Sequence, residues 1–269
     1  IEDYVSTSQY TTEEHQRAVV SDVIEHWNTY SHNSKFHAIF ATSSITEAIK
    51  YYQLFKEMKP SLRVTCLFDP NIDNRGGFEY KEEGLKEILD DYYKLYGSKY
   101  DMAKHAEFKK DVAFRLAHKE YHKGIERTPE KQLDLLIVVD QMLTGFDSKW
   151  VNTLYLDKVI EYESIIQAFS RTNRLFGNDK PFGVIRYYRK TNTMARNIKD
   201  AVKLYSGDKP LELFVDKLPK NLEGINTTYK EIKELFTSEG IKDFEKVPDD
   251  NAVSAKFVSL FNDFNEYLD

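Results

Sequence analysis

The pattern of apolar and polar positions predicts strands and helices in alternation over the first 190 residues. Compact apolar runs at residues 36–41, 63–68 and 133–139 have the length and composition of buried strands. Between the first and second runs, and again between the second and third, apolar positions recur every three or four residues. This spacing predicts amphipathic helices. This alternation is typical of an open parallel α/β sheet flanked by helices.

Two helix starts are marked by polar residues in the capping-box arrangement. Thr11 and Glu14 form the first, and Ser44 and Glu47 form the second. The helix that follows Ser44 stops at Pro60, because proline has no amide hydrogen to donate within a helix. We therefore expect one helix before the first strand and one helix directly after it.

Further helical segments lie outside this alternation. The charged stretch at about 78–128 is expected to be a helical insertion or to lie along one face of the sheet. After residue 190 the strand pattern disappears, and helical spacing predicts helices near 195–206, 222–236 and 257–268. Residues 191–269 are therefore predicted to form a helical extension that belongs to a larger helical domain.

The stretch from Asp134 to Arg174 concentrates the candidate chemistry. An apolar strand at 135–139 leads to the turn Thr144–Asp147, then to a short strand at 153–156 and to a predicted helix that reaches Arg174. On a helical wheel the polar residues at the end of this helix share one side, namely Gln167, Ser170, Arg171 and Arg174. A solvated surface helix has the same pattern, so periodicity alone leaves both interpretations open.

Composition and net charge indicate where the protein is expected to be found, but they identify no reaction or ligand. The formal net charge of −6 gives no support for a general electrostatic grip on nucleic acid, although a few loops can still line a nucleic-acid track. The single cysteine, Cys66, lies in an apolar run, where it is predicted to be a buried strand residue. A lone cysteine excludes an internal disulfide and fits a reducing compartment, and no apolar run is long enough to span a membrane. We expect a cytoplasmic protein.

The sequence lacks the motifs of several catalytic activities. No Gly-x-x-x-x-Gly-Lys-Ser/Thr loop occurs to cradle phosphates, and no Asp-Glu-x-His motif occurs to hold a metal, so the chain alone is expected neither to hydrolyse ATP nor to cleave DNA. Asp249 lacks the following carboxylate-x-Lys group of a nuclease. His118 and His122 have the spacing of metal ligands, but Lys119 replaces the glutamate of a zinc protease. We expect a solvated helix face there and no metal site.

The segments Thr144–Asp147, after an apolar strand, and Gln167–Arg174 resemble the fifth and sixth motifs of superfamily 2 helicases. Together with Phe36–Ser44, they resemble more closely the motor subunit of type I restriction endonucleases. Many superfamily 2 members have arginine at the place of Thr144 and glycine at the place of Ser170, and both departures agree with the type I subunit. The resemblance extends over about residues 1–189.

This resemblance implies a fold and a function. Residues 1–190 would be the second RecA-like lobe, of the P-loop NTPase type, of an ATP-driven double-stranded DNA translocase. ATP and Mg²⁺ would be held mainly by the first lobe, which is not in this sequence. Arg171 and Arg174 would be catalytic arginine fingers, with Arg174 reaching the γ-phosphate, because a planar and permanently charged guanidinium stabilises a transferring phosphoryl group.

The resemblance also implies binding residues and partners. Asp140 would sense closure of the lobes. Residues that line the nucleotide cleft would be Gln167, Gly145 and Asp147. Residues that donate hydrogen bonds to DNA phosphates would be Ser43, Ser44 and Thr144. Implied partners are duplex DNA, the first lobe and nuclease domain of the same subunit, and the methyltransferase and specificity subunits. A noncatalytic α/β interaction module with a helicase-like scaffold remains the alternative.

Overall fold

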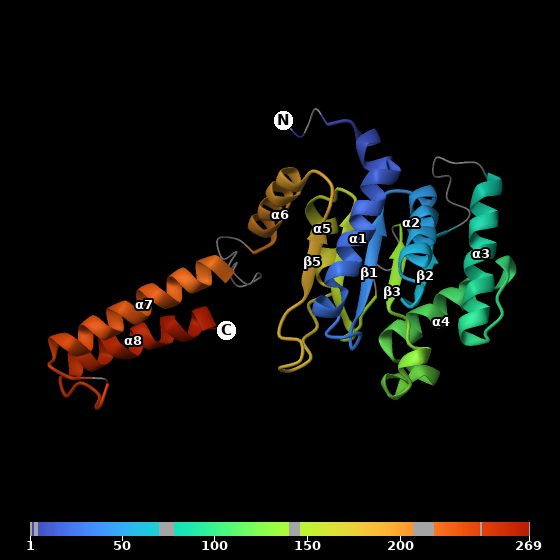
Figure 1. Ribbon diagram of the computed structural model, residues 1–269. Helices are drawn as coiled ribbons and strands as arrows, with labels where there is room; N and C mark the ends of the chain where they lie inside the picture. Colours follow the sequence, from blue (N-terminus) through green and yellow to red (C-terminus); the bar gives the residue numbers. More distant parts are fainter. Residues whose placement is uncertain are drawn as a thin grey trace. The chain divides into compact units, whose positions relative to one another are not determined.

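The computed structural model describes residues 2, 5–69, 78–139, 146–206, 218–242 and 244–268. The chain divides into two compact units, Ile1–Asp208 and Lys209–Asp269. The first unit is a sheet covered by helices, and the second contains a pair of helices (Figure 1). The candidate site lies in the first unit.

Five parallel strands form one open sheet, in the order β2-β3-β1-β4-β5. The central strand β1 (His37–Thr42) pairs with β3 (Leu135–Val138) on one side and with β4 (Val151–Asp157) on the other. Strands β2 (Val64–Leu67) and β5 (Val184–Tyr187) are the outermost strands. All residues of β1 to β4 are buried, as the apolar runs at 36–41, 63–68 and 133–139 predicted for β1, β2 and β3, whereas those of β5 are half-buried.

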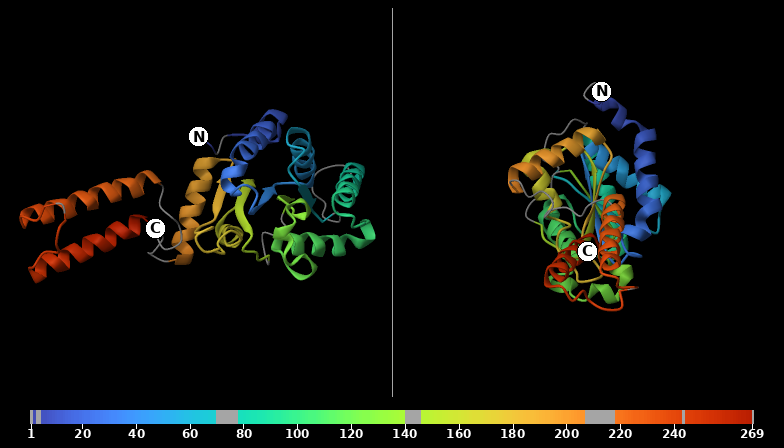
Figure 2. Two further views of the ribbon diagram at one scale, coloured as in Figure 1. Left: turned by 60° about the horizontal axis from the view of Figure 1, so that its bottom comes forward. Right: turned by 90° about the vertical axis from the view of Figure 1, so that its left-hand side faces the viewer.

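Helices cover both faces of the sheet. Connections between parallel strands are right-handed, so crossovers that run in opposite directions from the centre lie on opposite faces. Helix α2 (Ile45–Met58) leads from β1 towards β2, and α5 (Tyr162–Phe169) leads from β4 to β5 in the opposite direction. Accordingly, α1 (Glu13–Tyr30) packs beside α2 on one face, and α6 (Thr191–Ser206) packs beside α5 on the other (Figure 2).

The charged stretch between β2 and β3 is helical, as predicted. It contains α3 (Phe78–Tyr96) and α4 (His105–Ala117), and α3 contacts α2 and β2. A short 3-10 turn, η3 (Met102–Lys104), lies between α3 and α4. Three more complete the connection to β3, namely η4 (Glu120–His122), η5 (Ile125–Arg127) and η6 (Pro129–Lys131).

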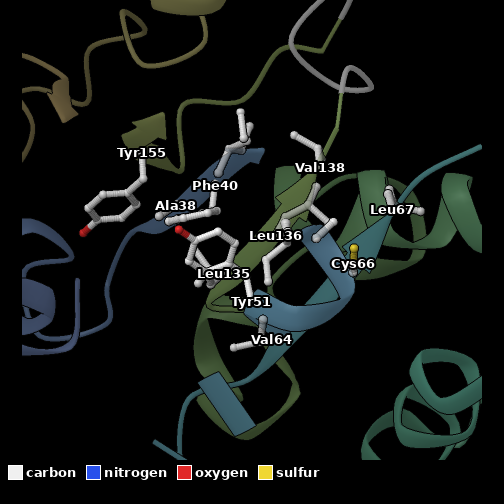
Figure 3. Packing of buried hydrophobic residues seen from close by; sticks show 14 of the residues in the cluster. Ala38, Phe40, Tyr51, Val64, Cys66, Leu67, Leu135, Leu136, Val138 and Tyr155 are labelled. Atoms are coloured by element: carbon white, nitrogen blue, oxygen red, sulfur yellow. The ribbon is translucent and has the colours of Figure 1, made fainter. Parts of the chain in front are cut away.

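The core forms where the central strands meet α2. The ring of Phe40 on β1 lies 4.7 Å from that of Tyr51 on α2 and 6.3 Å from that of Tyr155 on β4, measured between centroids (Figure 3). Burying an apolar side chain of this size contributes about 1.5–3 kcal/mol to folding. Cys66 on β2 is buried in the same cluster, as predicted, and burial raises the pKa of its thiol.

The second unit contains α7 (Leu218–Ser238) and α8 (Asn251–Leu268), which pack side by side. The ring of Phe236 on α7 lies 5.0 Å from those of Phe244 and Phe257. Both helices begin several residues before the predicted ranges 222–236 and 257–268.

The predicted fold class, an open parallel α/β sheet flanked by helices and followed by a helical extension, is confirmed. The first predicted cap is wrong by one residue. Thr12 caps α1 by accepting a hydrogen bond from the amide of His15, while the hydroxyl of Thr11 donates to the carbonyl of Ser8. Thr11 is used instead to close the short helix η2 (Thr7–Thr11), which the sequence pattern did not predict. Ser44 caps α2 as predicted, since its hydroxyl accepts from the amide of Glu47.

Candidate functional site

The predicted site residues lie at two opposite edges of the sheet. In a parallel sheet the strands all start at one edge, here called the amino edge, and all end at the other, here called the carboxyl edge. Asp147 precedes β4 and therefore lies at the amino edge. Helix α5 runs back from the carboxyl edge, so the segment after Phe169 also lies at the amino edge. Ser43 and Ser44 follow β1 and lie at the carboxyl edge.

Helix α5 ends at Phe169, so the prediction of a helix that reaches Arg174 is wrong. The amide of Ser170 still donates to the carbonyl four residues back, whereas those of Arg171 and Thr172 donate three residues back, in a tightening turn. Arg171 therefore lies in the turn that follows the helix, and Arg174 lies in the irregular segment after that turn. The weak helix propensity of Ser170, Thr172 and Asn173 is the local signal that could have marked this end.

Arg171 is half-buried, and its side chain donates hydrogen bonds to two backbone carbonyls and one hydroxyl. Its Nε donates to the carbonyl of Gln167 at 2.9 Å, and its guanidinium also donates to the carbonyl of Phe146 and to the hydroxyl of Ser170. Burial lowers the pKa of Arg171, and the carboxylate of Asp147 opposes that effect. In this structure the side chain fastens the end of α5 to the segment that enters β4.

Arg174 is arranged differently, because its side chain points into solvent. The side chain is 64% exposed, and its Nε forms an ion pair with Oδ1 of Asp147 at 2.6 Å. The side chain of Asp147 is itself 44% exposed. The structure therefore brings two predicted site residues, from the two separate motifs, into direct contact.

Of the remaining predicted residues in these two motifs, the structure describes Gln167 but not those before Phe146. Gln167 lies on α5, where its side-chain amide donates to the carboxylate of Glu163, one helical turn earlier. Asp140, Thr144 and Gly145 lie outside the described residues.

At the carboxyl edge, the two predicted serines are adjacent but have different partners. The hydroxyl oxygen of Ser44 is used as the cap of α2. The exposed Ser43 accepts a hydrogen bond from Nη1 of Arg189 at 3.1 Å, and its amide donates to Glu47 at 3.2 Å. The hydroxyl of Ser43 itself donates to the carbonyl of Asp157 at 3.4 Å. The oxygen of Ser44 accepts a bond as the cap, so its hydroxyl hydrogen can still be donated to another group.

A buried cluster of ion pairs, centred on Arg189, contacts Ser43. The sequence pattern did not predict it. Arg189 donates to both carboxylate oxygens of Asp157, at 3.0 and 2.7 Å, and to Glu47 at 2.9 Å. Asp157 also accepts hydrogen bonds from Tyr51 and pairs with His15. Burial alone raises the pKa of Asp157, but the hydrogen bonds from His15 and Arg189 outweigh it, and the pKa is lowered.

The expectation of a solvated face at His118 and His122 is wrong. Nε2 of His118 lies 2.7 Å from Nε2 of the buried His37, and its ring stacks on Trp150. Burial lowers the pKa of His118 to about 4 and holds that of His37 well below its usual value. His122 bonds to the buried carboxylate of Asp111 at 2.6 Å. Helix α4 ends at Ala117, and the chain then turns both histidines inwards.

Within the described part of the chain, no three side chains of the metal-binding types gather closely enough to hold an ion. No described helix is long and apolar enough to cross a membrane. Within the residues that the structure describes, what the amino edge offers chemically is an exposed guanidinium, Arg174, paired with the exposed carboxylate of Asp147. Such a group can bind a phosphate that displaces Asp147.

Comparison with known families settles where this chain belongs. The family described as type I restriction enzyme subunit R domain 3 matches residues 34–190, which is more than half of the chain. The chain belongs to this family. The match covers the sheet from the start of β1 to the end of β5 together with Arg171, Arg174 and Arg189. The resemblance seen in the sequence is confirmed at this level.

Relatives of the R subunit domain 3 family support the same assignment. A type I restriction enzyme endonuclease subunit from Staphylococcus aureus (strain COL) is 35% identical over 196 residues, which is 70% of this chain and 20% of that protein. A putative type I restriction enzyme endonuclease subunit from Methanocaldococcus jannaschii is 26% identical over 236 residues, or 88% of this chain and 19% of that protein. The chain thus spans about a fifth of the length of these curated relatives.

Among solved structures, Mss116p bound to ssRNA and AMP-PNP is similar with a TM-score of 0.42 and 11% sequence identity, over 94% of this chain and 42% of that one.

Proposed function

We propose that this chain is the second RecA-like lobe of an ATP-dependent double-stranded DNA translocase within a type I restriction enzyme R subunit. Residues 1–190 form the lobe and residues 191–269 begin a larger helical domain. ATP and Mg²⁺ are held mainly by the first lobe of the same subunit, because the Gly-x-x-x-x-Gly-Lys-Ser/Thr loop is absent from this sequence. The nuclease domain and the methyltransferase and specificity subunits complete the enzyme.

One observation carries this proposal, namely the exposed ion pair between Arg174 and Asp147 at the amino edge. When the lobes close, Arg174 leaves Asp147 and binds the γ-phosphate of the nucleotide held by the first lobe. An exposed pair contributes roughly 0–1 kcal/mol, so exchanging one anion for another is cheap. A guanidinium placed there stabilises the charge that develops on the transferring phosphoryl group.

The other site residues have supporting roles in this proposal. Arg171 holds the end of α5 against the carbonyl of Phe146 and adds positive charge to the same cleft. Gln167, Gly145 and Asp147 line the nucleotide cleft, and Gln167 releases Glu163 to do so. The hydroxyls of Ser43 and Ser44, with that of Thr144, donate to DNA phosphates, a contact that fixes register without reading bases.

The test is Arg174→Ala in the full-length subunit, assembled with its methyltransferase and specificity subunits. Loss of an arginine finger costs about 10³–10⁵-fold in turnover. We therefore expect DNA-stimulated ATPase and translocation to collapse while DNA binding persists. The control is Arg17→Ala, which removes another exposed arginine that is paired with carboxylates, far from the amino edge.

Near-normal ATP turnover by the Arg174→Ala enzyme would contradict the proposal. It would favour the alternative, a noncatalytic interaction module that keeps a helicase-like scaffold.

A further inference from the structure

Lys180 is a fully buried lysine in the connection between α5 and β5, with 0% of its surface exposed. Its ammonium donates to three backbone carbonyls, those of Arg174 at 2.6 Å, Val151 at 2.7 Å and Lys149 at 3.4 Å. Two of these carbonyls belong to the segment that enters β4, and the third belongs to the exposed arginine. The side chain therefore joins the backbone of Arg174 to the sheet.

The chemistry of this contact is specific to an ammonium group. Lysine carries three N–H donors and no acceptor, which matches three carbonyl oxygens. Burying a charge without a carboxylate partner is costly, and the cost is visible in the pKa of Lys180, which burial lowers to about 8. A methionine would fill a similar volume without that cost but would take the ammonium donor away from all three carbonyls. The buried ammonium therefore acts here as a hydrogen-bond donor to the three backbone carbonyls.

A second contact fixes the same turn from the other side. Thr172 lies between the two arginines and is only 2% exposed. It packs directly on the backbone of Gly183, where a Cβ atom would lie 2.6 Å from the carbonyl oxygen of Thr172. The loop that follows, residues 176–180, is closed by the hydrogen bond from the amide of Phe176 to the carbonyl of Lys180. The backbone on both sides of Arg174 is thus held, while the guanidinium is left in solvent.

We propose that Lys180 is a positioning residue that fixes the backbone of Arg174 so that its guanidinium meets the nucleotide phosphate in a preset geometry. This inference rests on the proposed role of Arg174 and deepens it. Catalytic groups must be held within a fraction of an ångström, and a displacement of about 1 Å can cost 10²-fold in rate. The buried ammonium provides this restraint from beneath, without touching the nucleotide.

The experiment compares Lys180→Met, Arg174→Ala and the double variant in the full-length subunit assembled with its methyltransferase and specificity subunits. We expect Lys180→Met to lower kcat of the DNA-stimulated ATPase by roughly 10–100-fold with little change in KM for ATP, since the lost restraint acts on the transition state. The double variant should be no slower than Arg174→Ala, because both changes remove the same interaction. Wild-type kcat in Lys180→Met, or a double variant that loses the product of both effects, overturns the proposal.

The control is Lys35→Met, which removes a neighbouring lysine that is 41% exposed and pairs with Asp179, next to Lys180. It should keep the wild-type kcat. Lys180→Gln retains two N–H donors and is expected to lose less turnover than Lys180→Met. It also serves as the test variant if the methionine form does not fold.

Hydrogen exchange separates this inference from the proposed function. Without the ammonium, the amides of Phe176 and Lys180 should exchange faster, while those of β4 keep their protection. If Arg174→Ala retains near-normal turnover, the proposed function fails, and the exchange measurement still decides whether Lys180 holds the turn. Unchanged exchange of these two amides in both Lys180 variants overturns the positioning role.

Discussion

Arg189 at the carboxyl edge and Arg174 at the amino edge both pair with an aspartate, yet their surroundings differ. Asp157, the partner of Arg189, is completely buried, and the same guanidinium also binds Glu47 and Ser43. The side chain of Asp147, the partner of Arg174, is 44% exposed. Arg189 is held through its side chain, whereas Arg174 is held through its backbone carbonyl, by Lys180.

This difference separates a structural arginine from one that can bind a new partner. Moving Arg189 would leave the buried carboxylates of Asp157 and Glu47 without their counter-charge, which costs several kcal/mol. Moving the side chain of Arg174 breaks one exposed pair, which costs about 1 kcal/mol or less. The contrast yields three predictions on the stability of the chain.

The largest effect is expected from Arg189→Met. Removing one partner of a buried ion pair destabilises a protein by about 3–5 kcal/mol. Urea unfolding of the chain should show a loss of this size in the free energy of unfolding. Both tryptophans, Trp27 and Trp150, lie in the first unit, so their fluorescence reports the unfolding of that unit.

The matched control is Arg17→Met. The side chain of Arg17 is 40% exposed and pairs with Glu13 and Glu57, so the loss should stay within about 1 kcal/mol. A loss below 1 kcal/mol for Arg189→Met would show that the carboxyl edge is no more firmly held than an exposed pair.

An intermediate effect is expected from pH, because the buried His118 and the buried Asp157 titrate in different pH ranges. The folded chain holds His118 neutral, with its pKa lowered to about 4, whereas an unfolded histidine titrates near 6.5. Stability from this histidine is complete above about pH 6.5 and falls as the pH drops towards 4, by at most about 1.4 kcal/mol per pH unit. The folded pKa of Asp157 is lowered, so its contribution to stability is complete above the unfolded pKa of about 3.9 and is lost as the pH falls below that value.

Urea midpoints measured between pH 7 and pH 5 check this prediction. The wild-type midpoint should fall with pH, and His118→Gln should give a flatter profile, whatever its absolute stability. His32→Gln, which changes an exposed histidine, is the control and should follow the wild-type slope. Parallel profiles for wild type and His118→Gln would contradict the expected role of the buried pair.

The sheet could be predicted because its strands are short and mainly apolar, and four of the five are buried along their whole length. The Arg189 cluster could not, because its partners Glu47 and Asp157 lie 142 and 32 residues away and only the fold brings them together. The same holds for the pairing of His37 with His118.

At the amino edge, part of the candidate site could be predicted from the sequence and part could not. The motifs around Asp147 and Arg174 can be identified from the sequence, and the structure brings the two side chains into direct contact. The end of α5 was misplaced because the apolar and polar positions keep helical spacing through Arg174. Lys180 was missed because a lysine in a polar loop has no sequence feature that distinguishes a buried ammonium from an exposed one.

The smallest effect on stability is expected from Arg174→Ala. The same substitution that should abolish ATP turnover in the full-length subunit should change the free energy of unfolding of the chain by no more than about 1 kcal/mol, since it removes an exposed pair and leaves the carbonyl of residue 174 bound to Lys180. The urea experiment used for Arg189→Met measures it directly. A loss approaching that of Arg189→Met would mean that the Asp147 pair stabilises the turn, and Arg174 would then not be free to exchange Asp147 for a phosphate.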